Sequence, residues 1–136
     1  MMKVGLLGGS FDPIHNGHVE MAKEAYRQLG LDEVWFIPTA DTPLKQRKLT
    51  CYEDRVEMII RAIAPYRHFY VSRIEEHTDG KNYTIDTIRK LNKMYPDYTF
   101  YFEGITSNEV GFFFVLDGNY LDIRKVGYFP NVGTAK

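Results

Sequence analysis

The sequence predicts an α/β fold in which helices cover both faces of a doubly wound parallel sheet. The first observation behind this prediction is that strand-like apolar runs alternate with helix-like stretches along the chain. The second is size, because the first strand, helix and strand occupy residues 3–37, as a βαβ unit of roughly 30 residues or more does. The third is that glycine or proline, the residues that most often interrupt helices and strands, stands where several predicted elements end.

The clearest elements lie in the first forty residues. Residues 3–7 predict a buried strand that stops at Gly8, and residues 34–37 predict a second strand that stops before Pro38. Between them, an apolar face with spacings of three and four residues predicts a helix, and it consists of Val19, Ala22, Tyr26 and Leu29. Gly30 then provides the left-handed residue that closes a helix. Two strands joined by such a helix run parallel.

A loop and a second helix follow. Residues 39–49 have no period and predict a loop, after which Thr50 and Glu53 form a capping-box pattern at the start of a helix. The helix stops at residues 64–65. Its apolar stripe consists of Val56, Ile59, Ile60 and Ile63.

The alternation then continues as far as the fourth strand. Residues 68–74 and 98–102 predict two further strands, and residues 84–94 predict the helix between them. Beyond this point, residues 112–116 and 120–128 could form short strands, although no further helical period is found.

Length, charge and cysteine content bound the class of protein. The 136 residues predict a single domain, and a net charge of −1 gives no basic field to hold nucleic acid. The single cysteine, Cys51, excludes a disulfide framework within the chain and favours a reducing compartment. No stretch resembles a signal peptide or a membrane span. We therefore expect a cytoplasmic protein that binds neither nucleic acid nor membrane.

The residues that carry chemistry lie between the first strand and the first helix, in the segment from Gly8 to His18. Ligands of doubly wound sheets bind outside the carboxyl ends of the strands, which is where this segment lies. Glycines allow close approach of the backbone, and the free amides of a helix start attract anions. Ser10 adds a hydroxyl, while His15 and His18 can each donate to phosphate oxygens. The competing interpretation is that the two histidines only cap the helix.

The segment resembles the His-X-Gly-His signature of the nucleotidylyltransferase superfamily, preceded by Gly-Gly-X-Phe-Asp-Pro as in the nicotinate mononucleotide adenylyltransferases. Similar segments follow in the family's order, at residues 43–45, 55–58, 83–87 and 95–96. The resemblance covers residues 3–102 and implies a Rossmann-like doubly wound parallel sheet of the nucleotidylyltransferase type.

The resemblance also implies site residues. It implies that His15, His18 and Lys45 are catalytic groups that contact the ATP triphosphate. The remaining residues that it implies for the bound nucleotides are Gly8, Gly9, Ser10, Phe11, Tyr83, Thr84, Asp86 and Gly104. Of these, Tyr83 and Thr84 would seat the nicotinate end, whereas Asp86 is explained as well by the dipole of its helix. Lys45 has an equally good alternative as part of a solvated loop.

The implied reaction is attack of the mononucleotide phosphate on the α-phosphorus of ATP, with Mg²⁺ and pyrophosphate release. It yields nicotinate adenine dinucleotide for NAD biosynthesis, without a covalent enzyme intermediate and without a metal ligand from the chain. Nicotinamide mononucleotide is a poorer candidate substrate. Pantetheine-phosphate adenylyltransferase and cytidylyltransferase are alternatives, which residues 83–86 disfavour. The other classes are an ATP-binding protein without turnover and a purely structural remnant.

The sequence departs from the family at three places. Leu44 stands where the family has histidine, and Gly104 is followed by isoleucine and threonine where the family has alanine and aspartate. Nothing in residues 106–136 matches the family's Ser-Ser-Thr-X-Ile-Arg segment. We therefore expect a family-like part, residues 1–104, and a divergent part, residues 105–136, with a sheet shortened at its C-terminal end. Such a sheet would expose apolar area, which predicts a homodimer or a tail folded over the gap.

Overall fold

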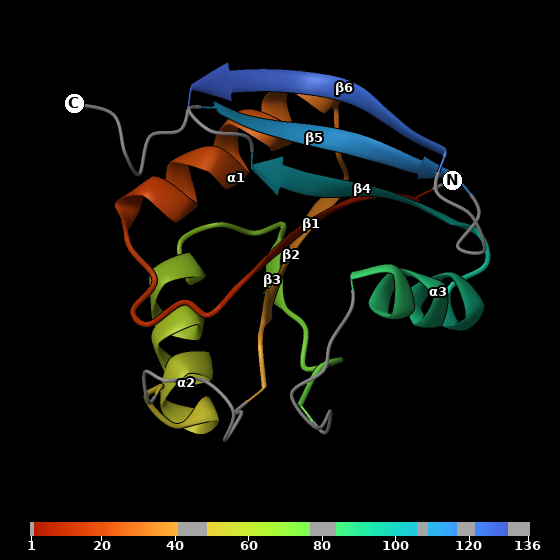
Figure 1. The fold of residues 1–136 in the computed structure, drawn as a ribbon. Coiled ribbons are helices and arrows are strands. Elements are labelled where there is room, and N and C mark those ends of the chain that lie inside the picture. Colours follow the sequence, from red (N-terminus) through yellow and green to blue (C-terminus); the bar gives the residue numbers. More distant parts are fainter. Residues whose placement is uncertain (1, 41–48, 77–83, 106–108, 117–121, 131–136) are drawn as a thin grey trace.

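A computed structural model describes residues 2–40, 49–76, 84–105, 109–116 and 122–130. In these residues six strands form one sheet with the order β3-β2-β1-β4-β5-β6, shown in Figure 1. The elements, in chain order, are β1 (Met2–Gly9), α1 (Asn16–Leu29), β2 (Glu33–Pro38), α2 (Tyr52–Ile63), β3 (Phe69–Val71), α3 (Thr84–Met94), β4 (Tyr98–Ile105), β5 (Glu109–Leu116) and β6 (Asp122–Pro130).

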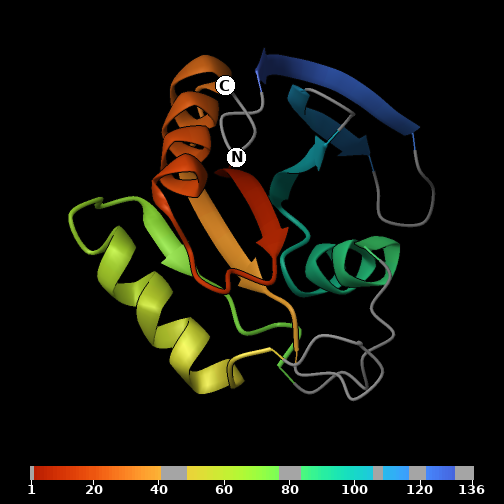
Figure 2. The same ribbon diagram turned by 60° about the vertical axis from the view of Figure 1, so that its left-hand side comes forward.

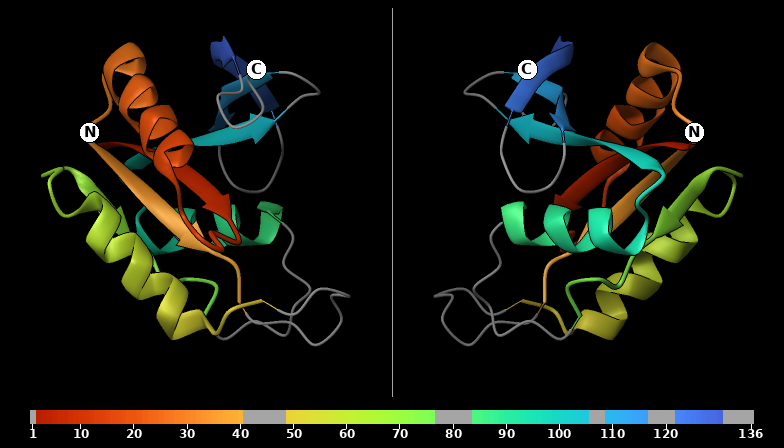
Figure 3. Two further views of the ribbon diagram at one scale, coloured as in Figure 1. Left: turned by 90° about the vertical axis from the view of Figure 1, so that its left-hand side faces the viewer. Right: turned by 90° about the vertical axis from the view of Figure 1, so that its right-hand side faces the viewer.

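The first four strands confirm the predicted parallel sheet. β1 lies at its centre and pairs in parallel with β2 on one side and β4 on the other, while β3 pairs in parallel with β2. Helices α1 and α2 cover one face and α3 covers the other, as Figures 2 and 3 show from three sides. The carboxyl ends of the parallel strands therefore meet at one edge, where the connections to the helices begin.

The core has two layers, one on each face of the sheet. Successive side chains of a strand point to opposite faces, so Leu7 packs under α1 and α2 whereas Leu6 packs under α3. The first layer also contains Phe36 and Ile59, and the second contains Ile88. All of these side chains are at most 2% exposed. Because both faces of β1 are covered, its residues 4–7 form an unbroken apolar run.

The helix ends agree only in part with the sequence prediction. Gly30 closes α1 in the left-handed conformation at φ 61°, as predicted. The capping box at Thr50 is wrong, because the cap of α2 is Cys51, which makes no side-chain cap hydrogen bond. The backbone amide of Thr50 instead donates to the Asp12 carboxylate at 2.9 Å. Ile60, predicted to lie on the apolar stripe, is 45% exposed because α2 covers the sheet with a narrower face.

The residues after β4 extend the sheet. β5 pairs with β4, and β6 pairs with β5, and both pairings are antiparallel. The parallel part of the sheet therefore ends at β4. β6 lies against α1, and Figure 1 shows it crossing beside that helix. β5 and β6 confirm that a strand lies in each of the ranges 112–116 and 120–128, although β5 starts earlier, at residue 109, and β6 spans residues 122–130. The homodimer stays a prediction. Among the described residues, none of the helices combines the length and the hydropathy that a membrane span requires.

Candidate functional site

The loop after β1 is anchored by a buried aromatic ring. Phe11 is 2% exposed and has φ 49°, a left-handed conformation that is uncommon outside glycine. Its ring contacts the His18 ring edge-on at 4.9 Å between centroids and lies 5.8 Å from the ring of Phe36. Phe11 was expected beside the nucleotide. In the structure its side chain belongs to the core and holds the loop that carries the two histidines.

His15 and His18 come together at the start of α1. Their rings stack at 3.8 Å between centroids. His15 is the cap residue, and its Nδ1 accepts a hydrogen bond from the amide of Gly17 at 3.1 Å. The Nδ1 of His18 accepts one from the amide of His15, also at 3.1 Å. The two histidines thus form a capping box, so the capping interpretation holds for one nitrogen of each ring.

These caps decide where the proton of each imidazole lies. A ring nitrogen that accepts an N–H bond must present a lone pair, so a neutral His15 or His18 carries its hydrogen on Nε2. Neither Nε2 is hydrogen-bonded to another of the described residues. Capping by Nδ1 therefore leaves two N–H donors available, and the structural and functional interpretations of the pair are compatible.

His18 is kept neutral by its surroundings. Burial and, to a smaller extent, the neighbouring His15 lower its pKa from 6.5 to about 4. A neutral imidazole at physiological pH is a hydrogen-bond donor without a permanent charge.

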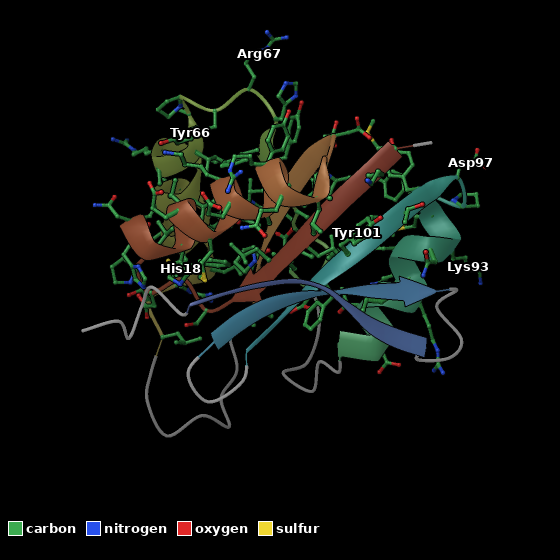
Figure 4. The ribbon with its side chains drawn as sticks, turned by 90° about the horizontal axis from the view of Figure 1, so that it is seen from above. His18, Tyr66, Arg67, Lys93, Asp97 and Tyr101 are labelled. Atoms are coloured by element: carbon green, nitrogen blue, oxygen red, sulfur yellow. The ribbon has the colours of Figure 1, made fainter. Side chains whose placement is uncertain are left out.

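Figure 4 places His18 at the opposite end of the molecule from Lys93 and Asp97, which lie where α3 ends and β4 begins.

A cavity of about 260 Å³ opens on the α3 face at the carboxyl end of β1. Its lining residues are Leu6, Gly8, Gly9, Ile37, Thr39, Glu75, Thr87, Ile88 and Phe102. Gly8 follows Leu6 by two residues in the strand and so faces the same side. A Cβ added at Gly8 would meet only the carbonyl oxygen of Ile37, at 3.9 Å. The protein leaves the space in front of this glycine open.

Glu75 is the polar group of this cavity that the sequence analysis missed. It is 9% exposed, and its Oε2 accepts a hydrogen bond from the Thr87 hydroxyl at 2.8 Å. Burial raises the pKa of the Glu75 carboxyl, while the bond from Thr87 opposes that shift. A buried carboxyl in a cleft marks a candidate functional group. The available signal was a carboxylate shortly after the third predicted strand, where ligands of such sheets bind.

The other predicted residues are placed as follows. Asp86 lies on the solvent side of α3, 3.9 Å from Arg89, and Thr87 rather than Asp86 lines the cavity. Thr84 begins α3, and Gly104 lies in β4 opposite Gly111 of β5. The carbonyl of Ser10 accepts a hydrogen bond from a buried arginine, Arg55. The remaining two predictions, Lys45 and Tyr83, fall outside the described residues.

The described part of the chain holds no group of three histidine, cysteine or carboxylate residues that could bind a metal ion. Asp12, the carboxylate of the histidine loop, accepts the amide of Thr50. The donor set of the loop is made of imidazole and amide hydrogens, which suits an anion and not a cation. The described residues thus do not fit a resident metal site.

Two half-sites are therefore linked through Gly9, which lines the cavity and lies against the ring of Phe11, the neighbour of His18. One presents the Nε2 donors of His15 and His18 at the start of α1. The other is the cavity on the α3 face. The arrangement can hold an anionic group on one side and a compact, partly apolar group on the other. Two ligands held in this way can react with each other directly, without passing through a protein-bound intermediate.

Comparison with known proteins shows the family to which the chain belongs. The family described as cytidylyltransferase-like matches residues 6–111. A probable nicotinate-nucleotide adenylyltransferase of Exiguobacterium sibiricum is 46% identical over 101 residues, which are 74% of this chain and 53% of that protein. The corresponding protein of Shouchella clausii is 47% identical over 103 residues, 75% of this chain and 54% of that protein. The chain thus spans about half the length of these relatives.

Solved structures agree on the fold. The nicotinic acid mononucleotide adenylyltransferase of Plasmodium falciparum, complexed with NaAD, superposes with a TM-score of 0.65 at 23% identity. The match covers 75% of this chain and 51% of that one. A complex of the Plasmodium falciparum enzyme with APC gives a TM-score of 0.62, also at 23% identity. At this level of identity the likeness concerns the fold.

Proposed function

The chain belongs to the cytidylyltransferase-like family, and from this premise we propose that it carries an adenylyl-transfer site acting on ATP and nicotinate mononucleotide. The products are nicotinate adenine dinucleotide and pyrophosphate, as in NAD biosynthesis. The observation that carries the proposal is the pair of histidines that cap α1 through Nδ1, next to the ring of Phe11, which lies against the cavity-lining Gly9. The similarity to nicotinate-nucleotide adenylyltransferases supports the choice of substrates.

The triphosphate of ATP belongs at the histidine side. His15 and His18 donate their Nε2 hydrogens to phosphate oxygens, and the amides at the start of α1 add partial positive charge. A phosphate oxygen of the mononucleotide attacks the α-phosphorus in line, and the bond between the α-phosphorus and the bridging oxygen breaks. The electron pair leaves with pyrophosphate. Donors aimed at the oxygens that gain charge lower the barrier, and we assign Ser10 and Lys45 to the same polyphosphate.

The mononucleotide belongs in the cavity. Ile37, Ile88 and Phe102 give it apolar walls for a pyridine ring. Gly8 and Gly9 allow the phosphate to approach the backbone. Thr84 begins α3, three residues before the cavity-lining Thr87, and we assign Thr84 and Tyr83 to the nicotinate end. Glu75 and Thr87 supply the polar groups of the wall for ribose hydroxyls.

Divalent metal enters this scheme with the substrate. Mg²⁺ prefers a few carboxylates together with substrate phosphates, so MgATP brings its own ion to the histidine side. Because the reaction draws on ATP and a mononucleotide, we propose that the protein acts in the cytoplasm. We also propose that residues 1–136 act as one unit, either alone or as a homodimer.

A coupled pyrophosphate assay tests the proposal. ATP is combined in turn with nicotinate mononucleotide, nicotinamide mononucleotide and phosphopantetheine, and CTP replaces ATP in a parallel series. The expected result is Mg²⁺-dependent pyrophosphate release that requires both ATP and nicotinate mononucleotide. Release with phosphopantetheine or CTP instead would replace the substrate assignment with that of another branch of the family.

A second candidate is an ATP-binding protein without turnover. It is favoured by the absence of a Ser-Ser-Thr-X-Ile-Arg match in residues 106–136. Titration calorimetry separates the two functions, because binding of ATP without pyrophosphate release in any substrate pair identifies the second. A flat ATP titration would contradict both.

A further inference from the structure

We infer that Arg55 is a positioning residue that fixes the two half-sites relative to each other. It belongs to α2 and lies away from the cavity lining, and its side chain is fully buried. The inference rests on the proposed function, because it assigns Arg55 a part in aligning the two substrates of that reaction. In the sequence, this arginine appears only as the first residue of the family-like segment 55–58, and the pattern indicates no role for its side chain.

The guanidinium binds three backbone carbonyls, one on the connection from β1 to α1 and two on the connection from β2 to α2. Its Nη1 donates to the carbonyl of Ser10 at 2.9 Å and to the carbonyl of Thr39 at 2.8 Å. Its Nε donates to the carbonyl of Thr50 at 2.7 Å. The Tyr52 ring lies 5.5 Å from the guanidinium carbon. One cation therefore holds the histidine loop, the end of β2 and the start of α2.

Two of these carbonyls belong to opposite half-sites. Ser10 begins the loop that leads to His15, whereas Thr39 lines the cavity. Thr39 is tied a second time, because its amide donates to the carbonyl of Gly9 at 2.9 Å. The single Nη1 atom thus connects the wall of the cavity to the loop that carries the imidazoles. A shift of either segment changes the separation between the two bound substrates.

Arginine suits this task for a chemical reason. A planar guanidinium offers several N–H donors in fixed directions, so one side chain can satisfy three carbonyls at once. Lysine has the same charge but a single donor atom on a flexible stem. Arg55→Lys therefore keeps a buried cation and removes the fixed geometry. Because misplacement by about 1 Å can cost about 10²-fold in rate, the loss should appear in turnover.

The experiment compares Arg55→Lys with Arg61→Lys, a matched control on the same helix. Arg61 is 79% exposed and pairs with Glu57 at 2.9 Å. Pyrophosphate release gives kcat and KM for ATP and for nicotinate mononucleotide, calorimetry gives the affinity for ATP, and thermal unfolding gives the melting temperature. All rates are measured at least 15 °C below the melting point of each variant, so that a loss of folded protein is excluded.

The expected result for Arg55→Lys is a fall in kcat of about 10²-fold with each KM within about threefold of the wild type. Arg61→Lys stays within twofold throughout. Addition of millimolar guanidinium to Arg55→Ala restores part of the lost kcat and has no effect on Arg61→Ala. A kcat within threefold of the wild type in Arg55→Lys, or an equal loss in ATP affinity and kcat, overturns the inference.

Absence of turnover in the wild type with every substrate pair would refute the proposed function. A spectroscopic measurement can then still test the role of Arg55, because it does not depend on turnover. Two-bond ¹⁵N–¹H spectra report which imidazole nitrogen carries the hydrogen. In the wild type and in Arg61→Lys, His15 and His18 should show the hydrogen on Nε2. In folded Arg55→Lys the loosened loop should give a mixture of both forms at one or both histidines. Identical spectra in all three proteins contradict the role of Arg55 in holding this loop.

Discussion

Two substitutions of His18 can separate its capping role from its proposed role toward the triphosphate. The Nδ1 atom accepts a hydrogen bond from the amide of His15 at 3.1 Å, which leaves the hydrogen of the neutral ring on Nε2. In His18→Asn, the side-chain oxygen occupies roughly the place of Nδ1 and can keep the cap. In His18→Gln, the longer side chain places its NH₂ group near the position of Nε2 and keeps the donor there.

The two variants should therefore fail in opposite assays. His18→Asn keeps the cap and loses the donor, so kcat should fall about 10²-fold or more, which is about 2.7 kcal/mol of transition-state stabilisation. His18→Gln loses the cap, which should lower the free energy of unfolding by about 1 kcal/mol, and should keep kcat within about tenfold of the wild type. Both variants lose the edge contact with Phe11, so that loss cancels in the comparison between them.

The assay is pyrophosphate release under saturating MgATP and nicotinate mononucleotide, with urea unfolding measured on the same preparations. His68→Asn is the matched control, because His68 lies on the connection before β3 and contacts Tyr26 at 5.5 Å between rings. It should keep the wild-type kcat. Equal turnover in His18→Asn and His18→Gln would show that the Nε2 hydrogen has no part in catalysis. The argument that capping by Nδ1 leaves Nε2 as a catalytic donor would then be wrong.

Three further predictions follow from the described side chains. The pKa of His18 in the folded protein is about 4, below its ordinary value of 6.5, so the contribution of the neutral ring to stability is present above pH 6.5 and is lost as the pH falls toward 4. Between pH 6.5 and pH 4, the urea midpoint of the wild type should therefore drop more steeply than that of His18→Gln. The Glu75 carboxyl has a raised pKa, so its contribution to the free energy of unfolding is greatest at low pH and declines as the carboxyl ionises. Glu75→Gln can keep the hydrogen bond from Thr87, so it should match or exceed the wild-type stability at pH 7 and show a flatter dependence of stability on pH. A large loss of stability in this variant at pH 7 would refute the reasoning. Gly8→Ala should fold with unchanged stability, because its Cβ meets only the Ile37 carbonyl at 3.9 Å, yet raise the KM for the mononucleotide about tenfold as the methyl group enters the cavity; an unchanged KM would remove the mononucleotide from this cavity.

Sequence reasoning succeeded where structure is determined by neighbours along the chain. The bounds of α3 were predicted as residues 84–94, and Gly30 was predicted as the left-handed end of α1. An amphipathic period and a glycine after it are local signals, so they survive without knowledge of the fold. The family resemblance was also confirmed, by a match over residues 6–111.

The walls of the site could not be predicted in the same way. Glu75 and Thr87 meet because β3 and α3 bring them together, and their separation in sequence carries no period. Arg55 looks like one more charged residue of an amphipathic helix, although it is fully buried. Its polar atoms are satisfied by three backbone carbonyls, one on the connection from β1 to α1 and two on the connection from β2 to α2. Such contacts are determined by tertiary structure, which the pattern of one helix does not encode.

The end of the sheet shows a different kind of gap, one that a further physical argument would have closed. A parallel connection between neighbouring strands needs a crossover of about a dozen residues or more, whereas an antiparallel one can be a short turn. Only residues 106–108 separate β4 from β5, and only residues 117–121 separate β5 from β6. Both connections are too short for a crossover, so once the strands are accepted their antiparallel pairing is required. The doubly wound pattern therefore applies up to β4, and β5 and β6 pair with it as an antiparallel extension.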